Sequence, residues 1–169
     1  MAQSAFETLG LPVRFDLDLT QIERAFMARV AQAHPDLACS ASETDAAALN
    51  EARRSLIDPE QRARAVLATR APDAQAPPLS PAFLAEILEV RQEAEDAMAS
   101  NDEETVERWR QWAADRRAAI ISELETLLGG EPEPLDEARA QLAAGVLQQW
   151  RYFERMLEQV GVPAHGPDA

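Results

Sequence analysis

The sequence has no lysine, one cysteine, few aromatic residues and no long apolar run. Cys39 has no second cysteine with which to form an internal disulfide bond, and neither it nor His34 has the paired ligands of a metal site. No apolar stretch approaches the roughly 20 residues that span a bilayer, and the N-terminus does not resemble a signal peptide. These absences predict a cytoplasmic protein with no metal and no other cofactor.

Positive charge is also scarce, because acids outnumber arginines and the net charge is −14. Residues 1–70 contain ten acids and eight arginines, which gives −2, whereas residues 71–169 contain twenty acids and eight arginines, which gives −12. Phosphate backbones and anionic lipids repel such a surface. The charge therefore excludes nucleic acid and membranes as expected partners.

What the sequence does contain is helix-forming composition. Apolar residues make up 46% of the chain, aromatic residues 5%, and there are only six glycines. A core built from Ala, Leu, Ile and Val with helical spacing predicts an all-α protein. In the first part, helices are expected over residues 20–33 and 42–57, with a short one after Asp58 and Pro59. Thr20 and Glu23 form a potential capping box for the first of these. The positions expected to pack against the next helix are Ile22, Ala25, Phe26, Val30 and Ala33.

A proline-rich connector, residues 71–80, divides the chain into two expected domains, residues 1–70 and 81–160. Ser80 and Pro81 are typical of a helix start, so a helix is expected over residues 81–99. A second helix should begin at Asn101 and end at Gly129 and Gly130, and a third should run from after Pro134 to about residue 160. Three helices with short turns predict an antiparallel bundle. The tail, residues 161–169, is expected to be disordered.

The tripeptide His34-Pro35-Asp36 is the most specific motif in the chain. Pro35 removes a backbone donor and disfavours helical dihedrals at His34, so the preceding helix must end there. An imidazole and a carboxylate are then presented on a loop. They lack a third orienting group, and the sequence has no nucleophile motif or glycine-rich phosphate loop, which predicts a protein that is not an enzyme. The simplest alternative is a helix-ending turn that binds nothing.

The tripeptide and its flanks resemble a J-domain, the module with which DnaJ-type co-chaperones engage a heat-shock chaperone. The resemblance extends over about residues 4–70 and includes AFETLGLP at residues 5–12, LNEA at residues 49–52 and LIDP at residues 56–59. With the acidic helical second part, it is similar to the HscB family of iron–sulfur cluster co-chaperones. The resemblance implies that an HscA-type chaperone ATPase is bound by His34, Pro35, Asp36, Arg24 and Arg29.

The chain departs from the J-domain pattern in three respects. J-domains usually have a strongly basic second helix and a lysine after the tripeptide, whereas this chain has only Arg24 and Arg29 in the helix and Leu37 after the tripeptide. Electrostatic steering toward the chaperone should therefore be weak. Arg53 replaces an aromatic residue of the third helix, and its aliphatic stem is expected to cover the core while its charge reaches water.

A candidate client site lies on the expected helix at residues 81–99. Phe83, Ile87, Val90, Ala94 and Ala97 form one narrow apolar stripe, which should face the bundle core. Two leucines lie on the shoulder of that stripe beside polar residues, which predicts a modest docking patch. Alternatively, the leucines only widen the core face. The patch comprises Leu84, Leu88, Glu89, Gln92 and Asp96.

The same segment, FLAEILEVR at residues 83–91, resembles the part of HscB that binds the cluster scaffold IscU. The resemblance implies that the patch binds an IscU-type scaffold and adds Tyr152, from WRYF at residues 150–153. It implies a co-chaperone that stimulates an HscA-type ATPase and delivers the scaffold to it. The alternatives are a J-domain co-chaperone of a general DnaK-type chaperone with another client, or an acidic helical adaptor with a vestigial J-domain.

Overall fold

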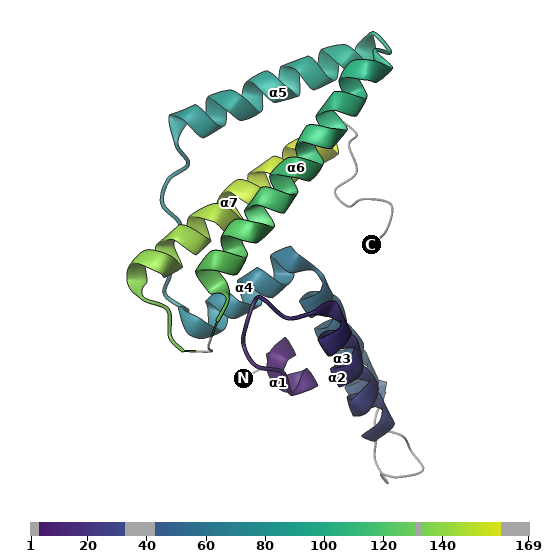
Figure 1. Cartoon of the computed structure of the whole chain (residues 1–169), viewed down its shortest axis with the longest axis vertical. Coiled ribbons are helices and arrows are strands. Elements are labelled where there is room, and N and C mark those ends of the chain that lie inside the picture. Colours follow the sequence, from purple (N-terminus) through teal and green to yellow (C-terminus); the bar gives the residue numbers. More distant parts are fainter. Residues whose placement is uncertain (1–3, 33–42, 131–132, 160–169) are drawn as a thin grey trace. The chain divides into compact units, whose positions relative to one another are not determined.

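The computed structural model describes residues 4–32, 43–130 and 133–159, and every regular element in these ranges is an α-helix (Figure 1). The predicted all-α fold class is therefore confirmed. The helices are α1 (Ala5–Leu9), α2 (Leu19–Gln32), α3 (Glu43–Ile57), α4 (Pro59–Arg70), α5 (Pro81–Ala99), α6 (Glu103–Leu128) and α7 (Glu137–Gln159). The predicted tail lies outside the described residues.

Most helix ends lie where local chemistry predicts them. Asp58 caps α4 with Pro59 in the first turn, and the Ser80 hydroxyl accepts a hydrogen bond from the Phe83 amide at 3.1 Å to start α5. The α6 helix ends before Gly129 and Gly130, and Gly130 takes the left-handed φ of +84°. These ends confirm the predicted limits of α5 and the predicted end of α6.

Two predicted helix starts are wrong. The α2 cap is Asp18 rather than Thr20, because the Asp18 carboxylate accepts from the Thr20 amide at 2.7 Å and Gln21 accepts from the Asp18 amide at 3.3 Å. Likewise Asp102, rather than Asn101, caps α6 by accepting from the Thr105 amide at 3.1 Å. Hydrogen bonds from the Thr105 side chain and amide lower the pKa of Asp102. In both cases a nearby carboxylate provides a stronger, charged acceptor at a helix N-terminus.

The chain divides into two compact units that do not follow the expected domain boundaries. The first unit combines Met1–Ala74 with Leu124–Ala140, and the second combines Gln75–Glu123 with Gln141–Ala169. The end of α6 and the start of α7 therefore belong with the N-terminal helices. Whether residues 1–70 and 81–160 fold separately stays a prediction.

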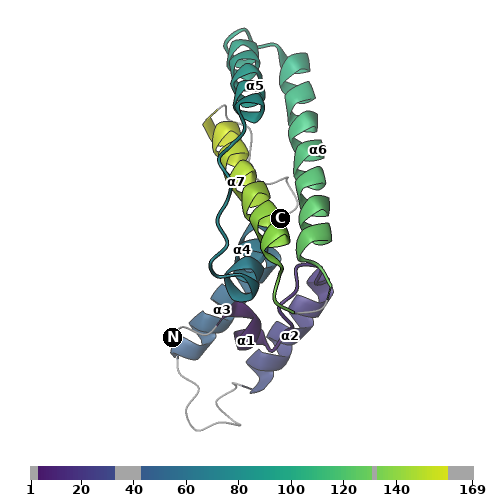
Figure 2. The same cartoon turned by 90° about the vertical axis from the view of Figure 1, so that its left-hand side faces the viewer.

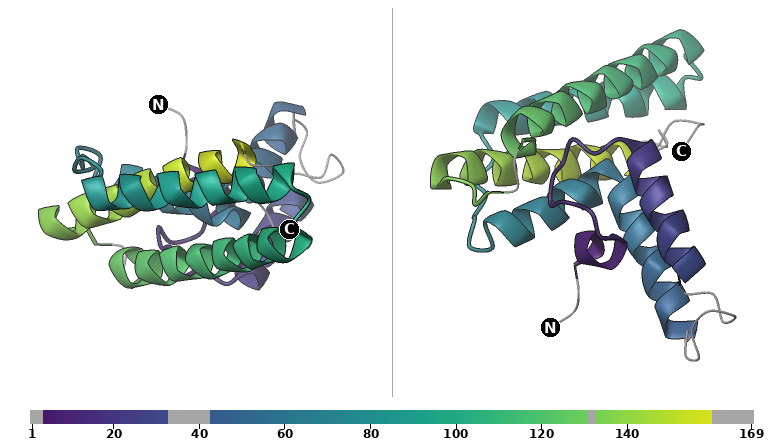
Figure 3. Two further views of the ribbon diagram at one scale, coloured as in Figure 1. Left: turned by 90° about the horizontal axis from the view of Figure 1, so that it is seen from above. Right: turned by 60° about the horizontal axis from the view of Figure 1, so that its bottom comes forward.

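In the first unit, α2 and α3 lie side by side and α1 packs against both (Figure 3). Phe6, Ile22 and Leu56 are fully buried at their centre. Ala25 and Phe26 are half-buried. Val30 is 39% exposed, so its predicted core position is wrong. The reason is helical geometry, since Val30 lies about 80° around α2 from Ile22 at 100° per residue. Ala33 lies outside the described residues.

Arg53 links α3 to α2. Its Nε atom lies 2.9 Å from each carboxylate oxygen of Glu23, and its Nη2 atom lies 2.6 Å from Oε1. The guanidinium also lies 5.3 Å from the centre of the Phe26 ring. The hydrogen bond from Arg53 lowers the pKa of Glu23. A charged fork thus joins two helices at the position where J-domains usually have an aromatic side chain.

This ion pair predicts a specific pH dependence of stability. Because the folded-state pKa of Glu23 is lowered, its stabilising contribution should be complete above the unfolded pKa of about 4.3 and disappear as pH falls through the folded pKa. Glu23→Gln should therefore lower the melting temperature at neutral pH, and the difference from wild type should shrink under acid. A difference that stays constant from neutral to acid pH would contradict the ion-pair explanation.

Arg70 connects α4 to the turn between α6 and α7 within the first unit. Its side chain is buried, and it donates from Nη1 to the Leu128 carbonyl at 2.8 Å and from Nε to the Glu133 carbonyl at 2.6 Å. The Leu135 amide in turn donates to the Arg70 carbonyl at 3.3 Å. Arg70 therefore satisfies a free carbonyl at the C-terminus of α6, where a cation is favoured.

Arg70→Ala should be strongly destabilising, because one buried and one partly buried carbonyl group would lose a charged donor. We expect a loss of about 2 to 3 kcal/mol in the free energy of unfolding, measured by chemical denaturation. Arg64, on the same helix, provides the matched control because it is exposed and forms only an i,i+4 ion pair with Glu60. Arg64→Ala should cost less than about 0.5 kcal/mol. Equal losses in the two variants would contradict the role assigned to Arg70.

The second unit consists of α5 with most of α6 and α7 (Figure 2). The predicted core stripe of α5 is confirmed, because Phe83, Ile87, Val90, Ala94 and Ala97 are all buried. On the other helices, Trp112 packs edge-on against the buried Phe153 ring at 5.4 Å between ring centres. Because one side of α5 is buried, its other side can present the predicted patch to solvent.

Candidate functional site

The predicted scaffold patch lies on the solvent side of α5. Leu88 is 59% exposed, and Glu89, Gln92 and Asp96 are also exposed. Leu84 is half-buried, so it lies at the margin of the core rather than fully outside it. An aliphatic side chain that stays in water gains no hydrophobic stabilisation unless a partner buries it. The exposure of Leu88 is therefore consistent with a docking surface.

Tyr152 of α7 lies at the N-terminal end of α5, the end that contains Leu84. Its ring packs edge-on against Phe83, with 6.1 Å between ring centres and an interplanar angle of 68°, while 41% of the residue remains exposed. Phe83 directly precedes Leu84 in the sequence. The structure therefore places the predicted aromatic residue of α7 beside the apolar end of the α5 patch.

The other end of the patch is polar and acidic. Gln92 donates a hydrogen bond to Asp96 at 3.3 Å, and the neighbouring Arg91 donates to Glu95 at 2.7 Å. Both interactions join residues one helical turn apart. With Glu89 also exposed, the surface carries net negative charge beside its apolar part. Such a surface suits a protein partner with an apolar contact surrounded by cations.

Arg24 and Arg29, the predicted chaperone-binding residues that the structure describes, differ in exposure. His34, Pro35 and Asp36 lie outside the described residues. Arg24 is exposed on α2, whereas Arg29 is half-buried against the end of α1. At Gly10, which has a φ of +70°, a Cβ atom would lie only 2.6 Å from Nη2 of Arg29. Arg24 is thus presented to solvent, and the Arg29 guanidinium packs on the glycine that ends α1.

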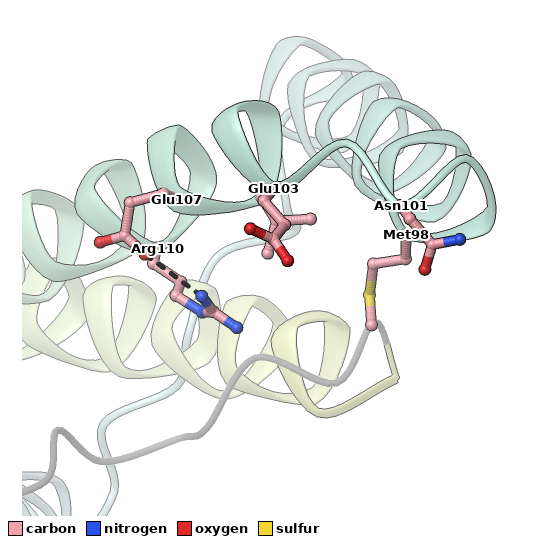
Figure 4. Close-up of a pocket in the computed structure, with 6 residues that line it drawn as sticks. Met98, Asn101, Glu103, Glu107 and Arg110 are labelled. Carbon is pink, nitrogen blue, oxygen red and sulfur yellow. Dashed lines mark hydrogen bonds and ion pairs between the residues drawn. The ribbon is translucent and has the colours of Figure 1, made fainter.

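A hollow beside the turn from α5 to α6 contains none of the predicted site residues (Figure 4). Arg110 there donates to Glu107 at 3.2 Å, so these two charges form an ion pair. The lining residues are Met98, Asn101, Glu103, Val106, Glu107 and Arg110. In the described part of the chain, no three His, Cys, Asp or Glu side chains gather as a metal site. None of the described helices combines the length and apolarity needed to span a bilayer.

Comparisons with known proteins identify the family. Residues 79–161 match the family model described as the HSCB C-terminal oligomerisation domain. The co-chaperone protein HscB homolog of Burkholderia multivorans is 31% identical over 95% of this chain and 94% of its own length. The homolog of Bordetella petrii is 33% identical over 94% of this chain and 95% of its own length. The chain belongs to the HscB co-chaperone family.

Solved HscB structures share the fold. HscB from Vibrio cholerae matches with a TM-score of 0.66 and 26% identity over 94% of this chain and 96% of that one. Human HscB matches with a TM-score of 0.62 and 16% identity over 95% of this chain and 84% of its own, which supports the fold alone. Membership in the HscB family supports a co-chaperone role in iron–sulfur cluster assembly.

Sequence reasoning missed two features near these HscB surfaces. It did not anticipate that Phe83, a core residue, also supports the exposed Tyr152 ring. The alternating four- and three-residue spacing of the core stripe identified Phe83 as buried, but spacing within one helix carries no information about its neighbour on another helix. It also did not anticipate that Arg29 turns toward Gly10, although a glycine at a helix end permits such a close approach.

Proposed function

We propose that this HscB-family chain is a cytoplasmic co-chaperone without catalytic activity of its own. It stimulates the ATPase of an HscA-type chaperone through its J-domain and delivers an IscU-type iron–sulfur scaffold through its C-terminal bundle. The observation that carries the proposal is the exposed apolar surface of α5, where Leu88 is 59% exposed next to an acidic margin and Tyr152 packs against Phe83 of the same helix.

The chaperone side of the proposal rests on His34, Pro35, Asp36, Arg24 and Arg29. Asp36 supplies a carboxylate for a charge-assisted hydrogen bond to a chaperone arginine. Arg24 is available for a direct contact because it is exposed on α2. Arg29 acts through the shape of the first unit, since its guanidinium packs against Gly10. Docking here couples client delivery to ATP hydrolysis by the chaperone.

The scaffold side uses Leu84, Leu88 and Tyr152 as apolar anchors, with Glu89, Gln92 and Asp96 at the margin. Apolar anchors at the centre of an interface contribute most of the binding energy once water is excluded. The acidic margin attracts a basic rim and repels acidic competitors. Because the chain forms no reactive centre in this proposal, its contribution is to hold the scaffold where the chaperone can bind it.

The alternative is a J-domain co-chaperone of a general DnaK-type chaperone that brings another client. Affinity capture from a cell extract with the full chain distinguishes the two by identifying both partners by mass spectrometry. We expect an HscA-type chaperone and an IscU-type scaffold. Recovery of a DnaK-type chaperone with an unrelated client would favour the alternative. Recovery of neither chaperone nor scaffold would contradict the proposal.

A further inference from the structure

Two arginines of α7 differ from the other arginines in the acidic C-terminal part of the chain. Residues 71–169 contain eight arginines, and six of them contact a carboxylate or the carbonyl groups at the end of α6. These six are Arg91, Arg108, Arg110, Arg116, Arg117 and Arg139. The other two, Arg151 and Arg155, are exposed and form no hydrogen bond or ion pair with the residues that the structure describes. We call them the α7 arginine pair.

The α7 arginine pair lies next to Tyr152 on the exposed side of α7. Arg151 and Arg155 are four residues apart, and Arg155 is three residues from Tyr152, spacings that make side chains neighbours on a helix surface. At 100° per residue, Arg155 lies about 60° and Arg151 about 100° around the helix from Tyr152. The buried Phe153 lies about 100° from Tyr152 in the opposite direction. The arginines therefore extend the exposed surface beyond Tyr152, away from the core.

Tyr152 in turn connects the arginine pair to the leucines of the α5 patch. Its ring packs against Phe83, with 6.1 Å between ring centres. Glu86 and Glu93 lie 3.9 and 4.0 Å from arginines of α6, which places α6 on one side of the buried stripe of α5. At 100° per residue, Leu84 lies about 100° from the centre of that stripe in the other direction. The α5 leucines, Tyr152 and the arginine pair therefore follow one another along one side of the second unit.

The chemistry of the pair suits a carboxylate. Like charges one turn apart on a helix repel each other, so Arg151 and Arg155 destabilise α7 slightly when nothing binds them. Glu158 lies on the same side of α7 but forms no ion pair with either arginine in the structure. A bound carboxylate removes the repulsion, and a planar guanidinium can hold it through two hydrogen bonds. Arginine and tyrosine are also enriched among the residues that dominate binding energy at protein interfaces.

We propose that the α7 arginine pair binds a carboxylate-bearing segment on the surface of the IscU-type scaffold. This inference rests on the proposed function and adds a contact of opposite charge to the patch. The surface then has acids beside the leucines on α5 and cations beyond Tyr152 on α7. Two signs of charge fix the orientation of a partner, because a scaffold bound the other way round would bring like charges together.

The test is the full chain with Arg151→Gln and Arg155→Gln together, measured as scaffold affinity by calorimetry. At about 50 mM salt we expect the dissociation constant to rise about tenfold, because two charge-assisted contacts are lost. At about 500 mM salt, where exposed charges are strongly screened, the difference from wild type should shrink to less than about threefold. A loss of affinity that is the same at both salt concentrations would overturn the inference. The melting temperature should not fall, because neither arginine has a partner among the described residues.

Arg108→Gln combined with Arg110→Gln provides the matched control. This double variant removes the same two charges from exposed positions of α6, so the net charge of the two variants is identical. It should stay within about twofold of the wild-type scaffold affinity. Equal weakening in both double variants would overturn the inference, because the effect would then follow net charge rather than location.

The carboxylate partner is tested on the scaffold itself. Replacing the exposed carboxylates of the scaffold by amides, one at a time, should identify one that reproduces the loss of affinity. That replacement should add nothing further to the loss caused by the α7 double variant, as expected for two groups that contact each other. If every replacement weakens both chains by the same factor, the inference is overturned.

The outcomes separate this inference from the proposed function. If wild type binds the scaffold and the α7 double variant binds it equally well, the inference fails and the proposed function stands. If wild type does not bind the scaffold, both fail. A second copy of the chain is the rival occupant, since residues 71–169 carry a net charge of −12. Sedimentation of the free chain tests this rival, and self-association that the α7 double variant abolishes would overturn the inference in favour of a dimer.

Discussion

A His34→Gln chain should bind its scaffold normally and yet fail to stimulate the HscA-type ATPase. The substitution keeps a polar side chain of similar size but removes the imidazole that the J-domain resemblance assigns to the chaperone contact. We expect stimulation to fall to the basal rate, which steady-state phosphate release would measure. The helical circular dichroism and melting temperature should not change, because the motif follows a proline-ended helix and need not support the core.

His165 is the one other histidine of the chain, so it provides a control with the same chemical change. His165→Gln makes the same change near the C-terminus and should leave stimulation intact. Normal stimulation by His34→Gln would show that the J-domain interpretation is wrong. An unfolded His34→Gln chain would instead favour the simpler explanation, in which the tripeptide is a turn needed for folding.

The second large effect concerns the α5 patch. Replacing Leu84 and Leu88 together with alanine should weaken scaffold binding at least about thirtyfold, measured by calorimetry, because central apolar anchors contribute about 2 kcal/mol or more. Leu88 is 59% exposed and Leu84 half-buried, so the cost in folding stability should be well below the 2 to 5 kcal/mol typical of one buried leucine. Stimulation of the chaperone without scaffold should persist.

Leu142 provides the matched control for the double variant. It is an exposed leucine, at 57%, and lies on α7 outside the predicted patch. Leu142→Ala should therefore retain scaffold affinity. Unchanged affinity in the Leu84→Ala/Leu88→Ala chain would place the client site elsewhere. A large fall in its melting temperature would assign both leucines to the bundle core and remove the structural basis of the patch.

Local sequence signals predicted most of the helical architecture. The Ser80-Pro81 pair and the core stripe from Phe83 to Ala97 fixed both the limits and the buried face of α5, because capping and helical spacing are properties of one segment. The errors at Thr20 and Asn101 arose where two candidate caps lie close together. There a carboxylate was the stronger acceptor, which residue type alone could have indicated.

Features that depend on contacts between distant segments were not predictable from spacing. Arg70 contacts the carbonyl groups of Leu128 and Glu133, about sixty residues away, and this groups the end of α6 with the first unit. The guanidinium of Arg53 pairs with Glu23 across thirty residues, a partner that the sequence did not predict. Nothing in a single helix reveals such partners, because either arginine could equally have remained in solvent.

The candidate site likewise combines positions that one helix predicts with a contact between two helices that it does not. Amphipathic spacing predicted an outward position for Leu88, Glu89, Gln92 and Asp96, and these residues are exposed. Tyr152 entered the patch only through family resemblance, and its contact with Phe83 depends on how α5 and α7 pack. The partner proposed for the patch is a separate molecule. Its identity is therefore inferred from chemistry and family membership rather than from the fold of this chain.

The most direct test of the account is the steady-state ATPase rate of a purified HscA-type chaperone with this chain, with an IscU-type scaffold, and with both together. We expect the chain alone to raise the rate. We expect chain and scaffold together to raise it beyond the sum of their separate effects, since one molecule presents the client and the J-domain at once. A rate with both that equals the rate with scaffold alone would contradict the co-chaperone role proposed for this chain.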